Sequence, residues 1–170
     1  MIEIRNARPK DASELADLFI GYIDEHREYI SHGEIQMGVG EGVIKDGHLE
    51  AAPARLARAK WLKYINSHIE DSENAHVWKA VDGDEVIVGF CVADIQEDGD
   101  EPFGMVCDVL VRDECRGKGV GGRLVESAVA WLRDKGVKGI YLESGKNNHA
   151  AHRFFEKRGF CHVSEIYKLA

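Results

Sequence analysis

Four glycines between positions 117 and 122 are the first residues that could do chemistry. They follow a strand-like apolar run, open an amphipathic helix and lie beside two basic side chains, Arg116 and Lys118. A helix N-terminus attracts anions because its peptide dipoles align, and glycine lets backbone N–H groups approach a phosphate closely. The sequence therefore predicts a phosphate-binding turn at this position.

Two well-known nucleotide-binding motifs are possible interpretations of this turn. Residues 117–122 read G-x-G-x-x-G, and Glu143 stands downstream where a dinucleotide-binding fold places its ribose-binding acid. In that fold the first glycine follows the strand directly, whereas a mostly charged stretch, residues 112–116, intervenes here. A Walker-type loop is excluded because its lysine precedes serine or threonine, and Lys118 precedes glycine.

A different register of the same turn, Arg116-x-x-Gly119-x-Gly121, resembles motif A of the GNAT acetyltransferases. In that family the motif Q/R-x-x-G-x-G/A holds the pyrophosphate of acetyl-coenzyme A. Downstream, the segment NHAAHRFFEKRGF (148–160) resembles motif B of the same superfamily. Two motifs in the right order, with a strand between them, are more specific than either alone. The resemblance covers nearly the whole chain and is strongest over residues 103–160.

The resemblance implies acetyl-CoA as cosubstrate and no metal. Coenzyme A would lie where the strand 103–111 splays from the strand 138–144, with backbone hydrogen bonds from the first strand to the pantetheine arm. Asn148 would fall near the thioester, and an aromatic pair would pack along the arm. The implied cofactor-binding residues are Val109, Leu110, Val111, Arg116, Gly117, Lys118, Gly119, Val120, Gly121, Gly122, Asn148, Phe154 and Phe155.

The implied reaction is transfer of an acetyl group from acetyl-CoA to a primary amine of a small molecule or peptide. The neutral amine attacks the thioester directly through a tetrahedral intermediate, so the enzyme forms no covalent intermediate. Asp108 is the first candidate for the general base that removes the amine proton, because many family members carry an acidic pair on this strand. Cys107 occupies the other position of that pair. Glu143 is the second candidate.

The residue that would act as general acid is harder to identify from the sequence. Many family members reprotonate the thiolate with a tyrosine of motif B, but this chain has Phe155 at that position, and a phenyl ring donates no proton. Tyr141, Tyr167 or water would then supply the proton, or the thiolate would leave unassisted. Tyr141 is the residue we assign to this role.

Two rival hypotheses stay open. One is a non-catalytic acyl-CoA-binding sensor, which Phe155 and Cys107 favour because they remove expected catalytic groups. In that case Asp108 would be a locally hydrogen-bonded polar residue. The other is a nicotinamide-dependent oxidoreductase, which binding of NAD or NADP would test. Among acceptors, a polyamine, an aminoglycoside and an amino-acid amine all fit the acidic composition.

The elements that must position these residues alternate in type along the chain. Hydrophobic periodicity and turn residues predict a mixed α/β (α+β) fold. The order of these elements resembles the GNAT fold, which implies a mostly antiparallel sheet of six to seven strands with about four helices. Asp11 and Glu14 are expected to form a capping box, and Pro53 to lie in a first helical turn. The expected order is strand 2–7, helix 11–29, loop 31–48, helix 53–72, a hairpin about 82–84, strand 103–111, helix 121–136, strand 138–144, helix 148–159 and strand 160–169.

Composition narrows the function further. The 170 residues, 44% hydrophobic with a formal net charge of −8, predict a single domain over 1–170 that binds neither nucleic acid nor membrane. The four cysteines lack C-x-x-C spacing, which predicts no metal site. With no apolar leader segment visible, the expected location is the cytoplasm. A homodimer is compatible with this composition.

Overall fold

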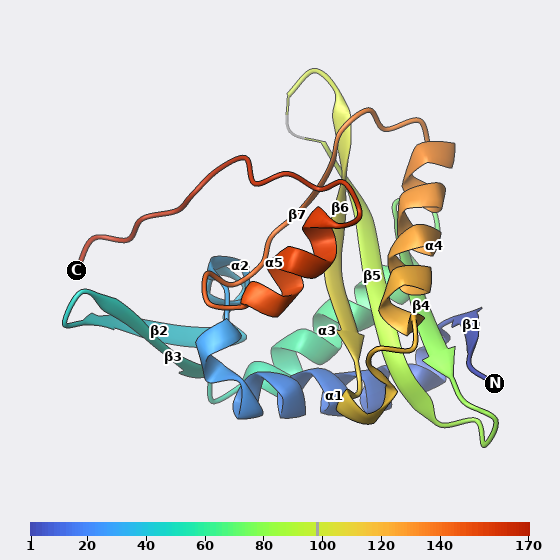
Figure 1. Cartoon of the computed structure of the whole chain (residues 1–170), viewed down its shortest axis with the longest axis horizontal. Coiled ribbons are helices and arrows are strands. Elements are labelled where there is room, and N and C mark those ends of the chain that lie inside the picture. Colours follow the sequence, from blue (N-terminus) through green and yellow to red (C-terminus); the bar gives the residue numbers. More distant parts are fainter. Residues whose placement is uncertain (98) are drawn as a thin grey trace. The chain divides into compact units, whose positions relative to one another are not determined.

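The computed structural model describes residues 1–97 and 99–170 (Figure 1). The described chain divides into two compact units. The first combines Met1–Ala16 with Leu62–Leu142, and the second combines Asp17–Trp61 with Glu143–Ala170. Two long helices, α1 (Ala12–Glu25) and α3 (Ala57–Glu70), each contribute residues to both units.

A five-stranded sheet forms the frame of the first unit. Its strand order is β1-β4-β5-β6-β7; β6 and β7 run parallel, and the other neighbours are antiparallel. This arrangement confirms the mixed, mostly antiparallel α/β architecture, although two of the seven described strands form a separate sheet. The strands are β1 (Glu3–Asn6), β4 (Ala75–Val81), β5 (Ile87–Glu97), β6 (Pro102–Val111) and β7 (Ile140–Leu142).

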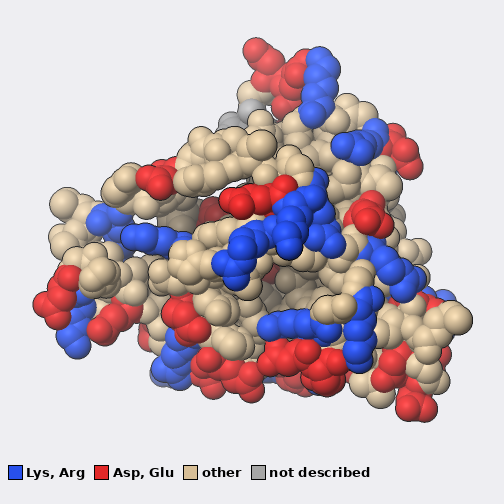
Figure 2. Space-filling view, viewed as in Figure 1, with Lys and Arg blue, Asp and Glu red and all other residues tan. Residues whose placement is uncertain are grey.

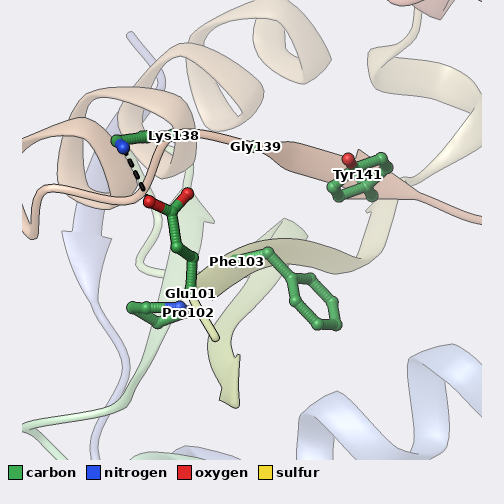
Figure 3. A pocket seen from close by; sticks show the side chains of 6 residues that line it. All are labelled: Glu101, Pro102, Phe103, Lys138, Gly139 and Tyr141. Atoms are coloured by element: carbon green, nitrogen blue, oxygen red, sulfur yellow. Dashed lines mark hydrogen bonds and ion pairs between the residues drawn. The ribbon is translucent and has the colours of Figure 1, made fainter. Parts of the chain in front are cut away.

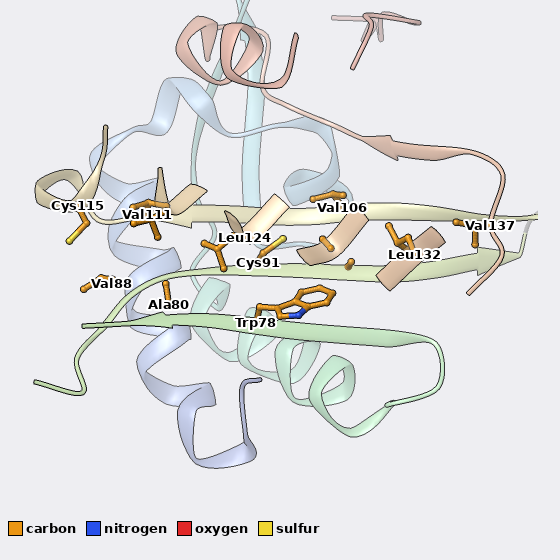
Figure 4. Close-up of a cluster of buried hydrophobic side chains, with 13 residues drawn as sticks. Trp78, Ala80, Val88, Cys91, Val106, Val111, Cys115, Leu124, Leu132 and Val137 are labelled. Atoms are coloured by element: carbon orange, nitrogen blue, oxygen red, sulfur yellow. The ribbon is translucent and has the colours of Figure 1, made fainter. Parts of the chain in front are cut away.

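Helix α4 (Val120–Asp134) covers one face of this sheet (Figure 4). Its buried side chains recur every three or four residues, so that one stripe of the helix is apolar. Leu124 and Leu132 on this stripe are fully buried and pack in one cluster with Trp78 and Val106 of the strands. The packing fixes where α4 begins, and therefore where the glycine turn before it lies.

The β5–β6 ladder depends on a glycine at position 89. A Cβ atom placed there would lie 2.7 Å from the carbonyl oxygen of Leu110 and 3.3 Å from the Cα atom of Val111. Backbone atoms of a paired strand cannot yield as a flexible side chain can. We therefore expect Gly89→Ala to lower the free energy of unfolding by about 1–3 kcal/mol in urea denaturation. Gly83→Ala, where a Cβ meets nothing within 4 Å, should change it far less and serves as control.

The second unit contains the glycine-rich segment for which the sequence composition predicts a loop. Residues 31–48 were expected to be a loop, but α2 (His32–Gln36) and a hairpin of β2 (Gly40–Lys45) and β3 (His48–Pro53) occupy this region. The hairpin turn is Asp46-Gly47, both in the left-handed region with φ of 50° and 78°, as a two-residue hairpin turn requires.

The glycines of this hairpin serve close packing. A Cβ atom on Gly40 would lie 2.7 Å from Ile30, and one on Gly42 would lie 2.8 Å from Leu49. The loop prediction was therefore wrong because it took these glycines as signs of mobility.

The prediction for Pro53 was also wrong, and Asp11 has partners that the sequence did not indicate. Pro53 ends β3, and α3 begins at Ala57, so the proline does not open that helix. The carboxylate of Asp11 accepts the backbone N–H of Arg8 at 2.7 Å and pairs with the Lys79 ammonium at 2.9 Å. Asp11 therefore fixes the turn before α1 to strand β4, and its capping box with Glu14 stays a prediction.

The chain after α5 (His149–Glu156) differs from prediction as well. The expected strand 160–169 carries no regular element, and Val163, Ile166 and Leu169 are exposed. Its alternating residues suit a strand, but a strand also needs a hydrogen-bonding neighbour, and no described strand pairs with it.

Acidic and basic side chains both appear on the face drawn in Figure 2. Among the helices of the described chain, none combines the length and the apolarity that a membrane crossing requires.

Candidate active site

The glycine turn connects the end of β6 to the start of α4. Gly117 and Gly119 have φ values of 73° and 79°, in the left-handed region that favours glycine, and a Cβ atom on either would meet nothing within 4 Å. Gly119 is the N-cap of α4 and provides no side-chain cap, and the first helical turn contains no acidic residue. The first N–H groups of α4 therefore receive no side-chain cap from Gly119, and they lie at the positive end of the helix.

Arginine side chains tie this turn to the sheet. The Nε of Arg116 donates to the Val111 carbonyl at 3.0 Å, and its Nη1 lies 2.8 Å from an Asp113 carboxylate oxygen. The Nε of Arg112 donates to the Ile87 carbonyl at 2.9 Å. These contacts hold the segment between strand and helix in one conformation, and about half of the Arg116 side chain stays exposed.

Strand β6 is paired on both edges only near its beginning. Its ladder with β7 runs from Gly104 to Val106, while its ladder with β5 continues to Val111. Within the described residues, positions 107–111 thus keep one edge without a ladder partner. This is the splay that the sequence analysis expected between the two strands, and it lies beside Val109, Leu110 and Val111.

A β-bulge interrupts β6 at the start of this splay. Val92 of β5 pairs with Asp108 and Ala93 pairs with Val106, so Cys107 is the extra residue. Before the bulge Val106 faces the core under α4, and after it Val109 and Val111 face the same core. Asp108 consequently points to the opposite face of the sheet, toward α3.

Asp108 makes a partly buried polar contact with α3. The hydroxyl of Tyr64 donates to its Oδ2 at 2.7 Å. Burial raises the pKa of Asp108 to about 6, while the Tyr64 hydrogen bond and the nearby His68 act in the opposite direction. A carboxyl group with such a pKa can accept a proton near neutral pH.

Helix α3 supplies two polar side chains that sequence reasoning missed as site residues. Tyr64 and His68 are one helical turn apart and their ring centroids lie 4.2 Å from each other. His68 Nδ1 lies 2.9 Å from the Tyr64 carbonyl oxygen, and its Nε2 lies 2.9 Å from Asp94 Oδ2. Burial, with the Asp108 charge, raises the pKa of Tyr64, which therefore stays a proton donor. The sequence does contain one signal for Tyr64 and His68 as site residues: both are polar, and their i, i+4 spacing places them on the face of the helix that points to the core.

Tyr141 lies elsewhere on the sheet (Figure 3). It pairs with Met105 near the beginning of β6, and its ring contacts Phe103 edge-on at 5.8 Å between centroids. The side chain lines a surface cavity of about 420 Å³ with Phe103 and the Lys138–Glu101 ion pair. This cavity is at the end of β6 remote from the glycine turn, so the structure does not bring Tyr141 to Asp108.

The other predicted site residues belong to the second unit. The carboxylate of Glu143 accepts the Gly33 N–H at 2.7 Å, and Asn148 caps α5 by accepting the Ala151 N–H at 3.3 Å. Phe154 and Phe155 contact each other at 5.1 Å between centroids. Glu143 thus already has a hydrogen-bonding partner in α2, whereas the aromatic pair lies partly exposed along α5.

Comparison with known proteins places this geometry in a family. The model of the acetyltransferase (GNAT) family matches residues 44–160. N-alpha-acetyltransferase 30 of Schizosaccharomyces pombe is 26% identical over 107 residues, which are 62% of this chain and 71% of the relative. The uncharacterized N-acetyltransferase YhdJ of Bacillus subtilis is 34% identical over 64 residues, 37% of this chain and 45% of that protein.

Solved structures share the fold. An acetyltransferase of Trypanosoma brucei superposes with a TM-score of 0.66 at 20% identity, covering 100% of this chain and 99% of the other. A predicted acetyltransferase of Clostridium acetobutylicum, solved with acetyl-CoA, gives 0.68 at 16% identity and covers 100% and 96%. With a family match that spans more than half of its length, the chain belongs to the GNAT family and is an acetyltransferase.

Proposed function

We propose that this protein transfers the acetyl group of acetyl-CoA to a primary amine of a small molecule or peptide, with residues 1–170 acting as one domain. The observation that carries the proposal is the uncapped glycine turn before α4, placed directly after a strand edge that also bears Asp108. The chain thereby offers an anion site and a partly buried carboxyl group on one continuous segment.

The glycine turn fits the phosphates of coenzyme A. Its two left-handed glycines adopt φ values that other residues rarely take, and the N-cap of α4 provides no side-chain cap for the first N–H groups. Val109, Leu110 and Val111 would bind the pantetheine arm through the splayed strand edge. When bound, the thioester supplies the activated acetyl group.

Asp108 would act as the base. It takes the proton that the attacking amine loses, and the Tyr64 hydroxyl holds the carboxylate in place. The leaving thiolate is a weak base, so its departure needs no strong acid, which suits a chain with Phe155 in motif B and Tyr141 at a distance.

The test is acetyl transfer to a panel of amines. Purified protein is mixed with acetyl-CoA and polyamines, aminoglycosides, amino acids or peptides with free N-termini, and the acetylated amine is measured by mass spectrometry. We expect at least one class to be acetylated in an enzyme-dependent way. Measuring the free thiol of the coenzyme A that is released would not suffice, because the protein's own Cys161 thiol is exposed and would also react with the reagent.

Membership of an acetyltransferase family weighs against the non-catalytic sensor, which Phe155 and Cys107 favour because they replace expected catalytic groups. Tight binding of acetyl-CoA without acetylation of any amine in the panel would support the sensor and overturn the proposed transfer.

A further inference from the structure

Three side chains with different donor atoms meet beside the β6 bulge. His68 of α3, Asp94 of β5 and Cys107 of β6 each place one nitrogen, oxygen or sulfur atom within 4.8 Å of the other two. All three residues lie in the first unit and are partly buried. Cysteine spacing along the sequence gave no hint of this cluster, because its members come from three separate elements.

The bulge creates the cluster. In a regular strand, consecutive side chains point to opposite faces, so Cys107 and Asp108 would be separated by the sheet. The extra residue instead lets both point toward α3, where Cys107 reaches His68 and Asp108 reaches Tyr64.

The histidine is oriented as a metal ligand requires. Because His68 Nδ1 lies 2.9 Å from the Tyr64 carbonyl oxygen, this nitrogen donates its proton to the backbone, and Nε2 faces Asp94 and Cys107. A backbone carbonyl behind the ring fixes ring orientation and tautomer in many metal sites, since the second nitrogen is then available to the ion.

The charge of the surroundings favours a cation. Burial, together with the nearby charges of Asp94 and Asp108, raises the pKa of the Cys107 thiol, whose Sγ lies 3.7 Å from the Met105 carbonyl oxygen. His68 is the basic group that faces these two carboxylates among the described contacts. A divalent ion would neutralise this excess of negative charge more completely than one imidazolium.

We propose that His68, Asp94 and Cys107 bind one zinc ion through Nε2, a carboxylate oxygen and the sulfur. Imidazole nitrogen, carboxylate oxygen and thiolate are the ligands that zinc takes in proteins, and three of them leave a fourth position for water. Cysteine binds as thiolate and histidine as neutral imidazole, so the Cys107 proton and the proton between His68 Nε2 and Asp94 both pass to the buffer on binding. The inference does not rest on the proposed function, because it concerns binding alone.

Cobalt(II) is the spectroscopic probe for this site. Tag-free, metal-depleted protein under reducing conditions is titrated with Co²⁺, and zinc is then added in competition. We expect one equivalent of Co²⁺ to give a thiolate-to-cobalt charge-transfer band and tetrahedral visible bands, which stoichiometric Zn²⁺ abolishes. Zn²⁺ should also raise the melting temperature of the protein, because it binds only the folded state.

Matched variants make the test specific. Cys107→Ser should remove the charge-transfer band, and His68→Gln and Asp94→Asn should each weaken zinc binding at least tenfold. Cys161→Ser and His76→Gln, which change a cysteine and a histidine outside the cluster, should bind like the parent. The proposal is overturned if the parent shows no charge-transfer band, or if Cys107→Ser keeps both the band and the zinc affinity while circular dichroism shows it folded.

Discussion

Gly121→Glu is expected to abolish acetyl-CoA binding while leaving the fold intact. Position 121 lies in the first turn of α4, two residues after the left-handed Gly119, so the new carboxylate would stand at the positive helix end proposed for the pyrophosphate. It would compete with the phosphates for the same N–H groups and repel them. We expect the dissociation constant measured by calorimetry to rise at least about 100-fold, equivalent to roughly 2.7 kcal/mol.

A glutamate introduced at another turn provides the control. Gly83 lies in the β4–β5 turn, and a Cβ atom there meets nothing within 4 Å. Gly83→Glu adds the same bulk and charge to the same unit and should leave acetyl-CoA affinity unchanged. Normal acetyl-CoA affinity in Gly121→Glu would disprove the assignment of the glycine turn as the phosphate site.

Asp108→Asn is expected to lower kcat about 10²- to 10⁴-fold, the range that loss of a general base produces. The amide keeps the size of the side chain and can still accept the Tyr64 hydroxyl at the site of the present 2.7 Å hydrogen bond. It cannot take a proton from the amine. Burial disfavours the charged carboxylate at this site, so the melting temperature of Asp108→Asn should stay the same or rise. A lower kcat with an unchanged or higher melting temperature would show that the variant has lost activity without losing its fold.

Two further variants place this result in context. Tyr64→Phe removes only the hydroxyl that holds Asp108, so kcat should fall less than in Asp108→Asn. Asp84→Asn, an exposed acid in the β4–β5 turn, should retain parental activity. Unchanged kcat in Asp108→Asn would show that water or another group removes the amine proton, and would remove Asp108 from the mechanism.

The sequence was most informative where local rules determine structure. The helix that follows the glycine turn, the strand before it and the hairpin about residues 82–84 all occur where periodicity and turn residues predicted them. Gly136 and Gly159 end their helices with φ of 82° and 90°, as glycine at that position usually does. These features depend on residues close together in the chain.

The missed features depend on tertiary contacts. In the sequence, Tyr64 and His68 are ordinary helix positions. Their role becomes visible only in the fold, where Asp94 of β5 and Asp108 of β6 lie within hydrogen-bonding distance of them. The hairpin of β2 and β3 was overlooked although Asp46-Gly47 is a strong turn signal, because the glycines around it outweighed the alternation of the strands. Residues 160–169 show the opposite error: their alternating pattern predicts a strand, but no described strand pairs with them.

The bulge in β6 also bears on how the chain finds its register during folding. A straight ladder between β5 and β6 would place Asp108 on the same face as Val106, among the apolar side chains under α4. An unpaired carboxylate buried in that core would cost several kcal/mol, so the slipped pairing is strongly disfavoured. The carboxylate assigned to proton transfer therefore also selects the correct strand alignment, and mutating it relaxes a folding constraint as well as removing a base.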